Sequence, residues 1–126
     1  MIQKVTIGFG ALYVLIGILG FIPGITRDVA DPGPVPMEGE LLGIFAVNLI
    51  HNLAHIGIGL ALAWGAMRAE RVMLTNRIMT AVFALLVVAS LIAPIVEGVA
   101  INAPDTILHV VSVLVVGYLG FIAPQG

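Results

Sequence analysis

The stretch that decides the fold runs from Gly43 to Gly59 and reads Gly-Ile-Phe-Ala-Val-Asn-Leu-Ile-His-Asn-Leu-Ala-His-Ile-Gly-Ile-Gly. It is apolar except for four side chains: Asn48, His51, Asn52 and His55. In a helix, their i, i+3, i+4, i+7 spacing places all four on one face. An unpaired amide or imidazole is costly in hydrocarbon, so we expect this face to point into a helix bundle and away from lipid.

The composition around this stretch is that of a membrane protein. Of the 126 residues, 60% are hydrophobic and 10% are charged, and the mean hydropathy is +1.17. A net charge of -2 with only five Lys and Arg residues leaves no basic surface, so we expect no nucleic-acid partner. The absence of cysteine excludes disulfides, thiolate metal sites and covalently attached c-type haem.

Four apolar runs are each long enough to cross a hydrocarbon core of about 30 Å. They cover residues 5–22, 41–67, 78–96 and 105–123. The predicted fold is therefore all-α, an integral membrane four-helix bundle with antiparallel spans in the lipid bilayer. We expect a single transmembrane domain over residues 1–126.

The first connection is predicted to be irregular. Three alternating prolines, Pro32, Pro34 and Pro36, favour an extended, polyproline-like loop over residues 26–40. A chain segment of this kind cannot form a membrane helix.

The second connection contains most of the basic residues, Arg68, Arg71 and Arg77. Thr75 or Asn76 is expected to cap the third span after it. The positive-inside rule, applied to this connection and to Lys4, places both termini in the cytoplasm.

Glycines recur at seven-residue intervals near the first span, at Gly10, Gly17 and Gly24. Small residues on one helix face let a neighbouring helix approach closely. We expect this face, together with Gly59 on the second span, to pack helix against helix.

The fourth span has a polar face of its own, because Asp105, His109 and Ser112 are spaced i, i+4 and i+7. A rise of about 1.5 Å per residue from the cytoplasmic ends puts His51, His55 and His109 at similar depths in the outer half of the membrane. The sequence therefore predicts that spans two and four are neighbours and that their polar faces meet.

The simplest role for these polar groups is an interhelical hydrogen-bond network without any cofactor. Besides the histidines and Asp105, the predicted network contains Asn48, Asn52, Asn102 and Ser112. Neither Ser90 nor Ser112 lies in a Gly-x-Ser-x-Gly elbow, so we assign no catalytic residue and favour a non-enzymatic role.

Ligand binding is the alternative that the same residues leave open. A divalent metal ion would take its ligands from His51, His55, Asp105 and His109. A b-type haem or a chlorophyll-like pigment would use His51, His55 and His109. Quinone or lipid binding and proton relay are further possibilities for such a cluster.

The chain resembles a bacterial family of small four-span membrane proteins catalogued as a domain of unknown function. Three segments carry the resemblance: Gly-Phe-Ile-Pro-Gly at 20–24, Leu-Gly-Ile-Phe-Ala-Val-Asn-Leu-Ile-His-Asn-Leu-Ala-His at 42–55, and Ile-Asn-Ala-Pro-Asp-Thr-Ile-Leu-His at 101–109. The resemblance implies four helices in a bacterial membrane, and it implies no activity.

From these observations we expect a multi-pass protein of the bacterial cytoplasmic membrane. Its expected role is that of a structural or accessory subunit, in a larger membrane complex or a homo-oligomer, because no loop is long enough to form a soluble catalytic domain. The alternative is a membrane protein that binds a metal, haem or pigment through its histidines.

Overall fold

Four helices form the body of the protein in the computed structural model, which describes residues 1–28, 36, 38–92 and 103–124. They are α1 (Ile2–Leu19), α2 (Leu49–Ala66), α3 (Ala69–Ile92) and α4 (Ala103–Gly117), which continues into the π-helix η1 (Tyr118–Ile122). With η1 counted as part of α4, each is long and apolar enough to cross a membrane. The predicted all-α, antiparallel membrane bundle is confirmed.

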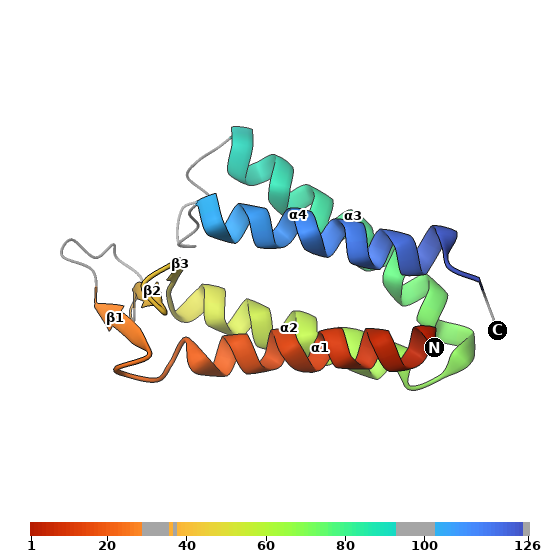
Figure 1. The fold of residues 1–126 in the computed structure, drawn as a ribbon, viewed down its shortest axis with the longest axis horizontal. Helices are drawn as coiled ribbons and strands as arrows, with labels where there is room; N and C mark the ends of the chain where they lie inside the picture. Colours follow the sequence, from red (N-terminus) through yellow and green to blue (C-terminus); the bar gives the residue numbers. More distant parts are fainter. Residues whose placement is uncertain (29–35, 37, 93–102, 125–126) are drawn as a thin grey trace.

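The helices associate in two close pairs. Figure 1 shows α1 alongside α2 and α4 alongside α3, with both termini at one end of the bundle. Helices α2 and α4 lie in different pairs. Spans two and four are therefore in contact, as predicted, but mainly through their side chains.

Glycines explain why α1 and α2 pack so closely. A Cβ on Gly17 would lie 2.8 Å from the backbone oxygen of Asn52, and one on Gly20 would lie 2.0 Å from the Asn52 side chain. Helix α2 can therefore approach α1 only where α1 has no side chain. Gly24 does not belong to this face, because it lies beyond the helix end with φ +94° and has open space around it.

A small antiparallel sheet covers the end of the bundle opposite the termini (Figure 1). Its strands, in spatial order, are β1 (Thr26–Asp28), β2 (Gly39–Leu41) and β3 (Phe45–Val47). The two ends of the predicted 26–40 loop are thus strands. The prolines at 32 and 34 fall outside the described residues.

The second helix starts later than predicted. Residues 41–47 were expected to be part of the second span, but Leu42 (φ 56°) and Gly43 (φ 71°) reverse the chain between β2 and β3. Asn48 then caps α2, its side-chain oxygen accepting a hydrogen bond of 2.9 Å from the backbone N–H of His51. The helix begins at Leu49 because this cap fixes its first turn.

The third helix starts earlier than predicted, at Ala69 instead of residue 78, so Thr75 and Asn76 lie within it and cap nothing. The charged segment that begins at Ala69 can be helical because a long side chain such as that of Arg71 extends to hydrogen-bond partners near the start of the helix. Arg71 donates to the backbone oxygen of Trp64 at 2.9 Å and lies 4.0 Å from the centre of its ring. The predicted end of this span at residue 96 lies outside the described residues.

The first helix is displaced toward the N-terminus relative to the predicted 5–22. It ends at Leu19, where the Thr26 hydroxyl donates to the Leu19 backbone oxygen at 3.1 Å. Helix α4 begins at Ala103, two residues before the predicted start at Asp105.

Candidate functional site

A cluster of buried polar side chains lies between the two helix pairs. Its members are His51 and His55 from α2, Asp105, His109 and Ser112 from α4, and Tyr13 from α1. Each is at most 4% exposed. We call these six residues the histidine cluster. The structure thus brings together the three histidines and Asp105, as the sequence suggested.

Aromatic rings form the centre of the histidine cluster. The imidazole of His55 is stacked between the Tyr13 ring, 4.6 Å away between centroids, and the His51 ring, 5.0 Å away. The His109 ring lies beside this stack, at 6.4 Å from His51 and 6.3 Å from His55. Three imidazoles from two helices therefore lie within 6.4 Å of one another, measured between ring centroids.

Asp105 lies at the end of the histidine cluster that is nearest the sheet. It lies in the first turn of α4, where a carboxylate is favoured by the helix dipole, and its Oδ1 is 4.0 Å from Nε2 of His51. The carboxylate gives this end of the cluster an electronegative character.

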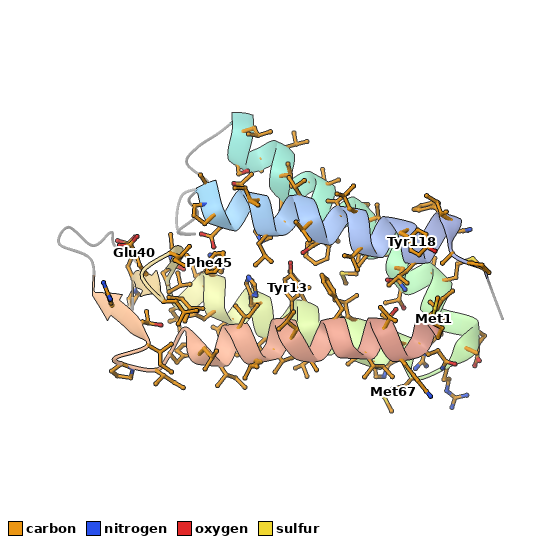
Figure 2. All side chains as sticks on the ribbon, in the orientation of Figure 1. Met1, Tyr13, Glu40, Phe45, Met67 and Tyr118 are labelled. Carbon is orange, nitrogen blue, oxygen red and sulfur yellow. The ribbon has the colours of Figure 1, made fainter. Side chains whose placement is uncertain are left out.

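Tyr13 is the member of the histidine cluster that sequence reasoning missed. It is fully buried, its ring contacts Phe9 and Phe83 as well as His55, and its hydroxyl shares a hydrogen bond with the hydroxyl of Ser112. Figure 2 shows the Tyr13 side chain directed from α1 toward α4. Its position in the sequence could have indicated this role, because Tyr13 lies between Gly10 and Gly17 on the face of the first span that carries the glycines.

The other predicted network residues have separate roles. Asn48 is the N-cap of α2, and Asn52 fills the space left by Gly20. Ser112 hydrogen bonds with Tyr13 and also donates to the Leu108 backbone oxygen at 2.8 Å. Asn102 lies outside the described residues.

Among the residues that the structure describes, three nitrogen atoms at or next to the cluster have no hydrogen-bond partner. They are Nδ1 of His55, Nδ1 of His109 and Nδ2 of Asn52, and all three are buried. A neutral imidazole offers one donor and one acceptor, so each unpaired Nδ1 can bind a further group. Buried polar atoms without partners in a native protein usually indicate a bound water, ion or ligand.

The arrangement of the side chains is not that of a formed metal centre. Within the described part of the chain, no three His, Asp or Glu side chains are positioned to hold a metal ion. The predicted ligands His51, His55, Asp105 and His109 are close together, and the His51 ring is stacked with the rings of both His55 and His109.

Apolar side chains lie between the cluster and the end of the bundle that carries the termini. Leu62, Phe83 and Val116 pack with Tyr13 directly beside the cluster. Beyond them, the side-chain amide of Asn76 donates to the Thr6 hydroxyl at 2.9 Å. A second apolar group follows, containing Ile2, Ala66, Val72, Leu119 and Ala123. The polar groups of the cluster are thus concentrated toward the sheet.

Residues 3–122 match the model of a family described as a domain of unknown function (DUF4383). No curated protein and no solved structure matches the chain.

Proposed function

The chain belongs to this family of unknown function, as the resemblance indicated, and we propose that it is a membrane-embedded binding protein whose site is the histidine cluster. The proposed ligand is small and either neutral or cationic. It would be held by the imidazoles of His55 and His109, one from each helix pair.

The observation that carries this proposal is the pair of unpaired Nδ1 atoms on His55 and His109. A network that serves only to hold helices together is stabilising when all of its members are paired, since each buried unpaired polar group costs about 1–3 kcal/mol. Two unpaired nitrogens on facing helices are better explained by a group that binds between them.

The surroundings of the two nitrogens favour a particular class of ligand. Asp105 supplies a carboxylate near His51, which attracts cations and hydrogen-bond donors and repels anions. The apolar groups on the termini side favour entry from the sheet side. We therefore propose a site that is open only toward the sheet, so that it binds its ligand without conducting it across the membrane.

The proposal is tested on protein purified in mild detergent and labelled with ¹⁵N at histidine. Native mass spectrometry, elemental analysis and absorption spectra of the same sample identify a co-purified small molecule, metal, haem or pigment. We expect the bound species to be lost in His109→Ala and retained in the control Thr80→Ala, whose hydroxyl donates to the Asn76 backbone oxygen within α3.

The NMR spectrum supplies an independent readout. With ligand bound, the Nδ1 resonances of His55 and His109 are expected at positions typical of a hydrogen-bonded or coordinated nitrogen. A sample that contains no bound species, and whose two Nδ1 atoms bond only to water, would contradict the proposal.

A structural or accessory role is the second candidate function. It is favoured by two hydrogen bonds between the helix pairs, Tyr13 with Ser112 and Asn76 with Thr6, because such bonds fix the shape of a bundle. The proposed partner is a larger membrane complex or a second copy of the chain. Cross-linking in native membranes followed by mass spectrometry tests for such a partner.

We also propose an orientation. Lys4, Arg68 and Arg71 lie at or beside the helix ends near the termini, and Arg77 contacts η1 there. The sheet end carries one basic residue, Arg27, with the acidic residues Asp28, Glu38 and Glu40. The positive-inside rule then places both termini in the cytoplasm of a bacterium and the sheet outside. In this orientation the histidine cluster takes its ligand from the external side.

A further inference from the structure

An apolar groove lies along the seam between α1 and α4, near the end of the bundle that carries the termini. Its volume is about 460 Å³. One wall is a stripe on α4 and η1, formed by Val111, Leu114, Val115, Tyr118 and Leu119. The other is formed by Val5 of α1 and by Met1, which precedes the helix. Figure 2 shows Met1 and Tyr118 near the same end of the bundle.

The groove exists because its two walls belong to different helix pairs. Helix α1 directs its glycine face toward α2, and its contacts with α4 include the Tyr13–Ser112 hydrogen bond nearer the middle of the bundle. The walls remain exposed on the outer surface, with Leu114 67% and Tyr118 47% accessible. In a membrane this surface faces the lipid tails.

The length and lining of the groove suit a lipid tail. From Val111 to Tyr118 the α4 wall is about 10 Å long at 1.5 Å per residue, which is within the roughly 15 Å depth of one leaflet. Every side chain that lines the groove is apolar except for the hydroxyl of Tyr118.

Basic residues at the termini end of the bundle, where the groove lies, favour an acidic headgroup. Lys4 is exposed and lies on the same turn of α1 as Met1 and Val5. Arg77 is at the same end, where it donates to the Gly120 backbone oxygen at 2.9 Å and packs over the Phe121 ring. Tyrosine side chains such as Tyr118 are common at the level of lipid headgroups.

We propose that the groove binds one acyl chain of an acidic phospholipid, with Lys4 pairing with the headgroup. This lipid site is separate from the histidine cluster and does not depend on the function proposed for it. It would hold the seam between the two helix pairs closed in the leaflet next to the termini.

The test uses the full chain in nanodiscs made of equal amounts of phosphatidylglycerol and phosphatidylcholine, followed by native mass spectrometry after mild delipidation. We expect one retained phosphatidylglycerol per chain. Val111→Trp fills the groove and should release this lipid, whereas Leu85→Trp, at a lipid-facing position on α3, should keep it.

A second variant tests the headgroup contact without changing the groove. Lys4→Gln should lower the preference for phosphatidylglycerol about fivefold, the effect of removing one basic residue near an anionic headgroup. Equal retention of the two lipids by the unmodified chain would overturn the proposal. It would also be overturned if Val111→Trp retained the lipid, or if a second copy of the chain or an isoprenoid occupied the groove.

Discussion

Gly10 of α1 and Gly59 of α2 touch backbone to backbone. A Cβ placed on Gly10 would lie 2.6 Å from the carbonyl oxygen of Gly59, and one placed on Gly59 would lie 2.4 Å from that of Gly10. Because both obstacles are main-chain atoms, neither can move aside as a side chain would. The contact defines the distance between the two helices.

Gly59→Ala is therefore expected to destabilise the protein by about 1–3 kcal/mol, the usual effect of overpacking a tight contact. Gly57→Ala is the matched control, since a Cβ there meets nothing within 4 Å and alanine favours a helix. Thermal unfolding in detergent should show a lower melting temperature for Gly59→Ala alone. Equal tolerance of both changes would mean that α1 and α2 are not in contact at Gly59.

The Tyr13–Ser112 hydrogen bond should couple the two helix pairs. Tyr13→Phe and Ser112→Ala each remove it, so their effects on the free energy of unfolding should not be additive. The expected coupling is near 0.6 kcal/mol and below about 1.7 kcal/mol, the range measured for bonds between membrane helices. Tyr118→Phe, at an exposed tyrosine, should show no coupling with Ser112→Ala.

The variants His55→Ala and His109→Ala distinguish a cluster that binds a ligand from one that is only a hydrogen-bond network. A ligand stabilises the fold by its binding free energy, so either change alone should remove nearly the whole stabilisation and the double variant should add little. Unfolding temperatures are compared for both single variants and the double variant, with and without a chelator. Fully additive losses, with no bound species in the unmodified protein, would instead indicate independent packing contributions.

The Asp105 carboxylate is expected to matter more than a surface carboxylate. Asp105→Asn keeps the size of this 2% exposed side chain but removes its charge next to His51, so both stability and ligand occupancy should fall. Glu70→Gln is the control, because Glu70 pairs with Arg68 at 3.6 Å on the surface, where ion pairs contribute little. Unfolding temperature and ligand content are measured for both; a loss for Glu70→Gln as large as that for Asp105→Asn would contradict this prediction.

The proposed orientation can be tested by cysteine labelling, since the chain has no cysteine of its own. A membrane-impermeant maleimide added to intact cells should label Ile44→Cys, in the turn before β3, and should label Glu70→Cys only after the membrane is opened. The reverse pattern would invert the orientation but leave the fold unchanged.

The helices could be predicted from the sequence because their apolar length is a physical requirement of crossing a bilayer. Their ends were less predictable, since they depend on local contacts. The start of α2 depends on the Asn48 cap and on the positive φ angles of Leu42 and Gly43. The start of α3 depends on Arg71 reaching the Trp64 backbone, which allows a charged turn to be helical.

The grouping of the histidines was also predictable, because residues on one face at similar depth must find partners in the bundle. The contribution of Tyr13 was not, since it depends on which helices pair. Only the close approach of α1 and α2 through glycine puts the Tyr13 ring against His55. Periodicity within each span contains no information about that pairing.

His51 and His55 lie on one helix pair, and Asp105 and His109 lie on the other. If the cluster binds the proposed ligand, its occupancy and the spacing of the two pairs are linked. The ligand would resist separation of the pairs by the same free energy by which separation weakens its binding. Lateral tension and bilayer thickness act on that spacing, because helices adjust to hydrophobic mismatch by tilting. The release of a ligand held in this position would therefore depend on the tension and the thickness of the surrounding membrane.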